Sequence, residues 1–399
     1  MRRLATILLL LATLAGISRA ESFPSFPSFP GAGAATRQFD ADTWWFRGLT
    51  FYAPFDDPAS PLRLLRGTGT LTFTRATTAT YVHPGTGLVT VASAGQLRIE
   101  TRGAFFEAAR TNSLLRSRTF DNAVWIKTNV TVAKDQVGED GVDNSAYTLT
   151  ATGDNGTLCQ PVTIGSAAYT GAFSIKRIAG TGTVQLSLDN GATWGLDNSS
   201  LLSTTAWFRA SKANQTLANP ELCLRLGTSG DNVAIDYAQM EAGAFASSRI
   251  PTTVAAVARN ADVLTFSLSG NASNTVGTLA AGFDYSVLNT ALRQSILYPV
   301  LYRNNTTQEM YSSDGTSSAV AASKPIANTA YIGASRWSSA DNLLKICFGG
   351  AITQAAFDGS MGLSASPGIA ESGAMWGHVK NLRIWSRAFT DAELNAITR

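Results

Sequence analysis

The feature that most constrains this chain is a series of short alternating segments between residues 147 and 240. In the last of them, Val233, Ile235 and Tyr237 occupy alternate positions, the period-two pattern of a half-buried strand. Asp-Asn-Gly turns at 154–156 and 189–191 separate neighbouring segments. The predicted strands are 147–151, 158–164, 169–177, 183–189, 206–213, 222–226 and 232–240. Strands of this length and spacing predict an antiparallel sandwich.

A second set of strand patterns follows the first. It comprises 262–268, 278–285, 295–302, 309–312, 330–334, 342–348 and 350–357, and a last strand carrying Val379, Leu382, Ile384 and Trp385. Thr390 followed by Glu393 is a capping box, which predicts one short helix at the C-terminal end. Only 15% of residues are charged, which suits turns and strands better than helices. The fold class expected is all-β, with two antiparallel β-sandwich (jelly-roll) domains.

The first 47 residues have the patterns of a signal peptide followed by a linker. Residues 1–20 combine a basic start, an apolar run and a small-residue exit, which predicts a secretory signal peptide. Residues 21–47 contain FPSFPSFP and GAGAA and are predicted to be a linker. Loss of Arg2, Arg3 and Arg19 would lower the Lys and Arg count from 31 to 28, equal to the 28 Asp and Glu. A neutral secreted chain without a membrane span is then expected, with no nucleic-acid partner.

Three cysteines leave two arrangements open. Cys159 and Cys223 both lie in strand-like segments and could form a disulfide in a secreted protein, which would leave Cys347 free. Alternatively, all three are buried thiols that act as small apolar residues.

Residues 101–127 resemble a module common in the tail-fibre and head-spike proteins of tailed bacteriophages. The matching residues are Arg102-Gly103, Phe105-Phe106, Glu107, Ala109-Arg110-Thr111-Asn112, Phe120, Asn122 and Trp125. The lead-in at 71–82 and the closing segment AQMEAGAFASSRIPTT resemble the same family. The resemblance implies a jelly roll similar to carbohydrate-binding modules over residues 101–255, and it implies architecture more than activity.

The C-terminal segment 377–397 resembles the end of laminin-G or concanavalin-like sandwiches, which implies such a domain over residues 256–399. Laminin-G-like domains often open with a strand that resembles Gly48 to Asp56. Our hypothesis is that the lead-in strands of residues 48–100 belong to the C-terminal sandwich, and that the jelly roll is inserted into it.

Catalytic patterns are missing from the sequence. A retaining glucanase of the concanavalin-like fold would need closely spaced acids on one strand, such as Glu-x-Asp-x-Glu, and no such run occurs. His83 and His378 are isolated, and there is no GxSxG or phosphate-binding loop. We therefore expect no enzyme activity. A polysaccharide-degrading enzyme is the third function considered, after glycan binding and a purely structural role.

Glycan binding by a sandwich requires exposed aromatic planes beside polar groups. Of the eight tryptophans, Trp125, Trp207 and Trp385 match strand positions and are read as core. The predicted glycan-binding residues are two loop tryptophans with polar neighbours: Trp194 with Asp189 and Asn190, and Trp337 with Arg336 and Asp341. Capped hydrophobic edges are the alternative reading of both.

No cofactor is expected apart from a structural calcium ion, since related jelly rolls often carry one. The candidate ligands are Asp121 and Asp236, with Asp140, Asp143 and Asn144 as further hard-oxygen donors. Solvated turn acids are the alternative.

The function expected from the sequence is non-catalytic binding of cell-surface or extracellular glycans by a secreted or virion-surface protein of the adhesin type. The partner would be a glycan or polysaccharide, and a homo-oligomer is compatible with the fold. The alternative is a structural virion or surface component without glycan binding.

Overall fold

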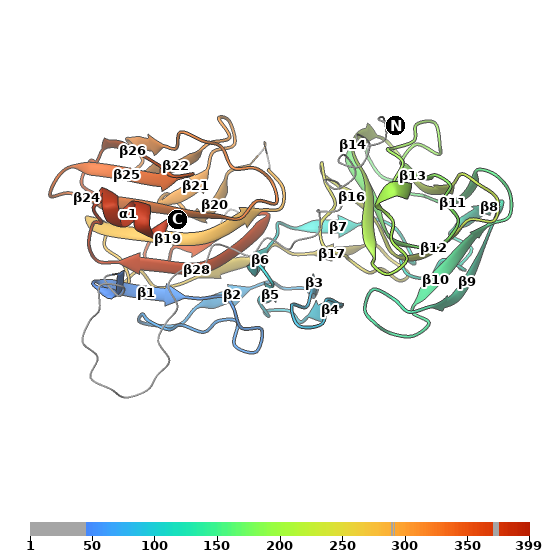
Figure 1. Cartoon of the computed structure of the whole chain (residues 1–399), viewed down its shortest axis with the longest axis horizontal. Helices are drawn as coiled ribbons and strands as arrows, with labels where there is room; N and C mark the ends of the chain where they lie inside the picture. Colours follow the sequence, from blue (N-terminus) through green and yellow to red (C-terminus); the bar gives the residue numbers. More distant parts are fainter. Residues whose placement is uncertain (1–44, 289, 291, 370–374) are drawn as a thin grey trace, which may run out of the picture.

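A computed structural model describes residues 45–288, 290, 292–369 and 375–399, apart from the side chain of Asn214. The predicted signal peptide and nearly all of the predicted linker lie outside these residues. Two β-sandwiches lie side by side along the long axis of the molecule (Figure 1). The predicted all-β class with a short C-terminal helix is confirmed. In the described part of the chain, no helix combines the length and apolar character needed to cross a membrane.

The largest sheet contains strands from both ends of the described chain (Figure 1). The sandwich to which it belongs is called the first sandwich. The order of the sheet is β26-β25-β24-β19-β28-β6-β5, and β1 also pairs with β28. The strands are β1 (Leu49–Ala53), β5 (Arg98–Glu100), β6 (Gly103–Phe106), β19 (Val276–Tyr285), β24 (Tyr331–Ser338), β25 (Leu343–Phe348), β26 (Ala351–Ala356) and β28 (Gly377–Trp385). Along one edge of β28, β1 pairs with residues 382–385 and β6 with residues 377–379.

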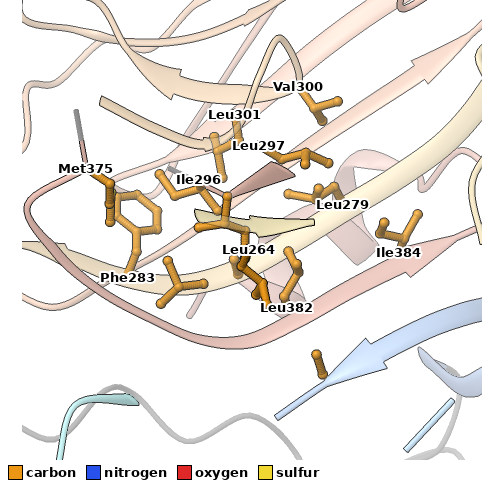
Figure 2. Close-up of a cluster of buried hydrophobic side chains, with 14 of the residues drawn as sticks. Leu264, Leu279, Phe283, Ile296, Leu297, Val300, Leu301, Met375, Leu382 and Ile384 are labelled. Carbon is orange, nitrogen blue, oxygen red and sulfur yellow. The ribbon is translucent and has the colours of Figure 1, made fainter. Parts of the chain in front are cut away.

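Smaller sheets complete the first sandwich. One has the order β20-β21-β22-β23 and another β2-β18-β27. Their strands are β20 (Gln294–Leu297), β21 (Leu301–Arg303), β22 (Met310–Ser313), β23 (Ser318–Val320), β2 (Thr72–Thr74), β18 (Val263–Thr265) and β27 (Gly368–Ile369). Side chains from these sheets and from the large sheet meet in one buried cluster (Figure 2). The single strand predicted at 295–302 is wrong, because the chain turns at residues 298–300 between β20 and β21.

Helix α1 (Asp391–Ile397) packs through Leu394 and Ile397 with Trp45, Trp385 and other residues of a separate buried cluster. The capping box is present, since the Thr390 side chain accepts from the Glu393 backbone N–H and the Glu393 side chain accepts from that of Thr390. Because the sheet is covered in this way, its central strands β19 and β28 are buried at most positions.

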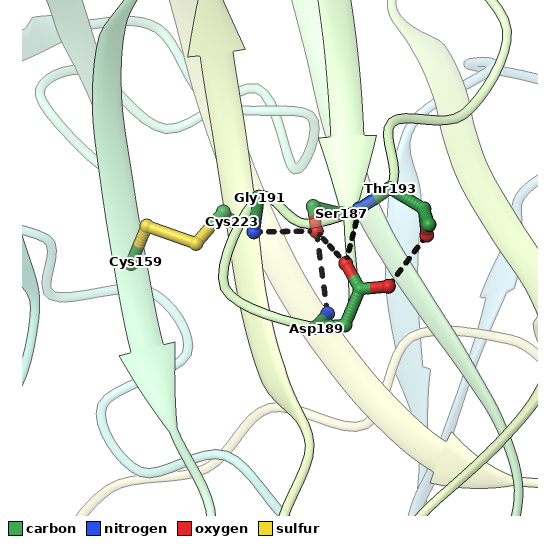
Figure 3. Close-up of a disulfide and its surroundings, with 6 residues drawn as sticks. All are labelled: Cys159, Ser187, Asp189, Gly191, Thr193 and Cys223. Carbon is green, nitrogen blue, oxygen red and sulfur yellow. Dashed lines mark hydrogen bonds between the residues drawn. A yellow bond between two sulfur atoms is a disulfide. The ribbon is translucent and has the colours of Figure 1, made fainter.

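The second sandwich consists of sheets with orders β14-β12-β16-β10-β9 and β13-β15-β11-β8. Its strands are β8 (Ile126–Thr128), β9 (Val130–Gln136), β10 (Ala146–Ala151), β11 (Gly156–Pro161), β12 (Ala167–Ala179), β13 (Val184–Ser187), β14 (Phe208–Leu217), β15 (Glu221–Leu226) and β16 (Asn232–Ala242). Phe120, Trp125, Tyr147 and Phe173 form an aromatic group in its core. Cys159 and Cys223, opposite each other on β11 and β15, form a disulfide (Figure 3).

The chain passes between the sandwiches twice. It leaves the first sandwich after β6 through β7 (Arg110–Asn112) and returns through β17 (Val257–Arg259), and these two strands pair with each other. The hairpin of β3 (Ala79–Val82) and β4 (Val89–Ala92) lies near this crossing (Figure 1). The pairing of β1 and β6 with β28, and of β5 with β6, supports the insertion hypothesis, which stays a proposal.

Candidate functional site

A cleft with a volume of about 240 Å³ lies between the two sandwiches. The first sandwich lines it with residues of β3, β5, β6 and β28, and the second with residues 245–249 and with Arg209 of β14. Ligand sites occur preferentially at such domain boundaries. This volume lies below the range of roughly 300–1,000 Å³ for drug-sized ligands, so a short segment of a larger molecule fits it best.

His378 of β28 lies between two carboxylates at one end of the cleft. Its Nδ1 is 3.0 Å from Oδ1 of Asp284, and its Nε2 is 3.1 Å from Oε2 of Glu100. Burial alone would lower the pKa of His378, but hydrogen bonds and charge attraction from Asp284 and Glu100 raise it to about 9. The imidazole is therefore an imidazolium at neutral pH.

Aromatic rings line the cleft beside this charged group. The half-buried Phe105 ring stacks on His378, with ring centroids 4.7 Å apart, and the guanidinium of Arg98 lies 4.6 Å from the Phe105 centroid. Half-buried Phe245 meets Trp376 edge to face at 4.7 Å. The Trp376 indole N–H is buried and has no acceptor within the described residues. The cleft thus offers apolar ring surface from both sandwiches.

Glu107 forms the charged centre at the base of the cleft. It is 2% exposed, forms ion pairs with Arg98 and Arg259, and accepts from the Ser248 backbone N–H at 2.8 Å and the Ser248 hydroxyl at 2.6 Å. Burial alone would raise the pKa of Glu107, but Arg259 and Arg98 lower it to about 2. Asp262 accepts in turn from Arg75 and Arg98.

This geometry suits binding better than acid–base catalysis. A nucleophile-activating histidine needs one ring nitrogen free to take a proton, and both nitrogens of His378 face carboxylates. Glu107 is saturated by arginines and Ser248. Glu100 keeps 19% of its side chain exposed, and Arg249 keeps 16%. The cleft therefore presents to a ligand the partly exposed Glu100 carboxylate, the Arg249 guanidinium, which is also paired with Glu139, and aromatic ring surface.

The structure places the predicted Trp194 group in the loop that follows β13 and that hydrogen-bonds back to this strand. Asp189 accepts from the Ser187 and Thr193 hydroxyls and the Thr193 backbone N–H, which orders the loop (Figure 3). Burial would raise the pKa of Asp189, but the hydrogen bonds from Thr193 and Ser187 lower it. Asn190 is exposed with a left-handed φ of 54°. Trp194 is half-buried, and Arg225 lies 4.2 Å from its ring centroid.

The structure does not bring the second predicted group, Trp337 with Arg336 and Asp341, together as one site. Trp337 does not lie in a loop: it belongs to β24, is 1% exposed and donates its indole N–H to the Ser273 carbonyl at 2.8 Å. The expectation of an exposed Trp337 ring is wrong, because β24 continues to Ser338, beyond the end of the predicted strand. Arg336 points to the other side of the sheet and forms an ion pair with Asp341. Trp125 and Trp385 are buried as expected, whereas Trp207 is only half-buried.

The predicted calcium ligands are engaged elsewhere. Both carboxylate oxygens of Asp236 accept from Arg118, at 2.7 and 2.8 Å, and Arg118 also pairs with Asp140 at 2.8 Å. Asp121 accepts from the Tyr147 hydroxyl at 2.9 Å. Within the described ranges, the one group of three His, Cys, Asp or Glu side chains close enough to share an ion is Cys159, Glu221 and Cys223, and its two cysteines form the disulfide. Arg118 thus supplies the positive charge that calcium was expected to supply.

Sequence reasoning missed the cleft, although it had singled out much of its lining. Phe105 and Glu107 lie in the segment that resembles phage proteins, and Phe245, Ser248 and Arg249 lie in its closing segment. The usable signal was a set of charged residues within otherwise apolar strand segments. Such residues are seldom buried unless they are paired.

Comparisons with known proteins give distant similarities in structure. No protein-family model and no curated protein matches this sequence. The CBM22-1 xylan-binding domain of Paenibacillus barcinonensis Xyn10C aligns with 34% of this chain and 94% of its own, at 13% identity and a TM-score of 0.23. The N-terminal CBM22-1-CBM22-2 tandem domain of the same protein aligns with 69% of this chain and 96% of its own, at 10% identity and a TM-score of 0.24.

A tail fibre protein from a phage of E. coli is also similar. The alignment covers 70% of this chain and 41% of that chain, at 8% identity and a TM-score of 0.20. At these identities and TM-scores the similarities assign no function to this chain.

Proposed function

We propose that this protein is a non-catalytic carbohydrate-binding protein and that a sugar binds in the cleft between its two sandwiches. One observation carries the proposal: partly exposed aromatic rings from both sandwiches, Phe105 and Phe245, line the same cleft as the Glu100 carboxylate and the Arg249 guanidinium. Sugars are bound by aromatic surface that packs on C–H groups and by charged or amide groups that bond hydroxyls. The role that follows is adhesion to cell-surface or extracellular glycans by a secreted or virion-surface protein.

The Trp194 loop is kept in this proposal as a second binding surface. Its ring is half-buried against Arg225, so it offers less free surface than an exposed platform would. Asp189 is committed to the loop itself, which leaves exposed Asn190 as the polar group beside the ring.

A glycan array probed with the chain from Glu21 onward tests the proposal. We expect selective binding that Phe245→Ala weakens by about tenfold or more, since it removes one ring of the cleft. Trp194→Ala tests the second surface in the same way and should weaken binding less, because its half-buried ring offers less free surface. Melting temperatures of both variants establish that they are folded.

Three outcomes would change the conclusion. Loss of binding in Trp194→Ala alone would move the site to the loop. Equal binding by both variants and the unaltered chain would remove both surfaces. No binding by a folded chain at high concentration would favour the alternative, a structural surface component.

A further inference from the structure

A second groove, with a volume of about 520 Å³, lies beside the hairpin of β24 and β25. Arg336 and Lys345 line it and are direct partners across the two strands, so their side chains leave the same face of the sheet. Ser338, Phe389 and Thr390 also line the groove. Asp341 and Asp391 line it as well, so the groove holds two neighbouring cations and the two carboxylates that pair with them.

The two cations and their acidic partners differ in how firmly they are held. Arg336 and Lys345 have side chains only 6% and 11% exposed, and both lie within strands. Their partners, Asp341 and Asp391, are 45% and 56% exposed and lie in the hairpin turn and at the start of α1. Exposed acids exchange readily with water, whereas the buried cations cannot leave the groove.

Arg336 also has bonding capacity to spare. Its Nη1 donates to Oδ2 of Asp341 at 2.9 Å, and its Nη2 donates to the same oxygen. Its Nε is buried without an acceptor within the described residues. A guanidinium bonds most strongly when two nitrogens face two oxygens of one carboxylate. The internal pair does not reach that arrangement, so an external carboxylate can compete with Asp341.

We infer that this groove binds a carboxylate-bearing saccharide, such as a uronic acid unit of an acidic polysaccharide. The sugar carboxylate takes the place of Asp341 on Arg336 and of Asp391 on Lys345, and both aspartates turn to solvent. The Ser338 hydroxyl, two residues from Arg336 on the same face of β24, is placed to bond the sugar ring. This inference deepens the proposed function by naming a saccharide class, but it concerns a surface separate from the cleft.

Binding is measured with the full chain and three probes, in the presence of a chelator that prevents gelation by divalent cations. The probes are polygalacturonate, its methyl ester and dextran sulfate. We expect polygalacturonate to bind and its methyl ester not to bind, because esterification removes the charge and keeps the sugar. Equal binding of the ester, or binding of dextran sulfate without polygalacturonate, would overturn the inference.

The decisive variant is Asp341→Asn, which removes the internal competitor and leaves both cations in place. We expect it to tighten polygalacturonate binding by about tenfold, a gain that a purely structural ion pair would not give. Asp56→Asn is the matched control, because Asp56 is in an exposed ion pair with Arg63 and its loss changes the net charge equally. No gain in Asp341→Asn, or the same gain in Asp56→Asn, contradicts the inference.

Arg336→Gln should abolish polygalacturonate binding. Phe245→Ala separates this inference from the proposed function, since it removes a ring of the cleft and leaves the groove intact. If polygalacturonate binds while the array shows no cleft-dependent glycan, the groove stands and the cleft fails. If Phe245→Ala abolishes polygalacturonate binding, the saccharide occupies the cleft and the groove fails.

Discussion

At the scale of single residues, the charged side chains between the sandwiches stabilise the structure only as a set. Glu107, Arg98, Arg259 and Asp262 are each at most 2% exposed. An isolated buried charge costs several kcal/mol, and mutual pairing offsets this cost. Each of these residues therefore depends on the others being present.

His378 should make stability depend on pH in the alkaline range. Its folded pKa of about 9 lies above the ordinary value of 6.5, so its contribution is fully present below pH 6.5 and is lost as pH rises through 9. We expect the free energy of unfolding to fall by up to about 3 kcal/mol over this interval. Denaturant titrations at pH 6.5 and 9.5 measure the fall.

The control for this prediction is His378→Gln, which cannot carry the charge. Its free energy of unfolding should be lower at pH 6.5 and should change less up to pH 9.5. Parallel pH profiles for the variant and the unaltered chain would show that other groups cause the dependence.

At the scale of strands, Gly103 explains the glycine of the recognised Arg-Gly pair. Its φ is +117°, and a Cβ there would lie 2.5 Å from the Val379 carbonyl oxygen of β28. β6 and β28 can approach this closely only without a side chain at residue 103. The motif thus fixes the joining of β6 to the large sheet.

Gly103→Ala should therefore destabilise the protein much more than Gly95→Ala. Gly95 also has positive φ, at +72°, but a Cβ there meets nothing within 4 Å. We expect a cost of about 1 kcal/mol at Gly95 from backbone strain alone, and several kcal/mol at Gly103. Thermal and denaturant unfolding of the two variants compare the costs. Equal losses would mean that the close approach of β6 and β28 adds nothing.

Local patterns predicted the strands well where alternation or capping decided the structure. β16 follows from the alternation of Val233, Ile235 and Tyr237, and α1 follows from Thr390 and Glu393. Trp337 was placed wrongly because its position depends on a distant residue. It lies opposite Gly277 of β19, where a Cβ would contact the Trp337 ring, and nothing near residue 337 reveals this pairing.

The cleft could not be predicted for the same reason. Glu100 and Phe105, Phe245, and His378 come from three parts of the chain and line one cleft only after β5, β6 and β28 have assembled. Likewise, Asp236, which was predicted as a calcium ligand, is paired with Arg118, a residue distant from it in sequence. The local sequence shows which residue types are present, but which residues they contact depends on the order of the strands in the sheets.

At the scale of the whole molecule, a group of paired charged residues, here called the charged joint, links the two sandwiches. Glu107 connects Arg98 of β5 with Arg259 of β17 and with Ser248, which follows β16. Asp262 lies at the return of the chain to the first sandwich and pairs with Arg75 and Arg98. Disturbance of this joint should affect both sandwiches.

Glu107→Ala should uncouple their unfolding. It leaves Arg259 without its carboxylate partner and should cost about 3–5 kcal/mol. We expect one calorimetric transition for the unaltered chain and two for the variant, since each sandwich keeps its own core. Asp56→Ala is the control, because loss of an exposed pair costs at most about 1 kcal/mol. One unchanged transition in Glu107→Ala would show that the joint does not couple the sandwiches.

The pairing of β1 with β28 also determines how the molecule would carry a mechanical load. A pull between Trp45 and Arg399 acts on the β1–β28 ladder and on the packing of α1 in the first sandwich. The second sandwich is connected to the first through two adjacent strands, β7 and β17, that pair with each other. It therefore does not bear this load. A load held between these two residues would therefore strain the first sandwich, and the cleft between the sandwiches would open only after that sandwich gave way.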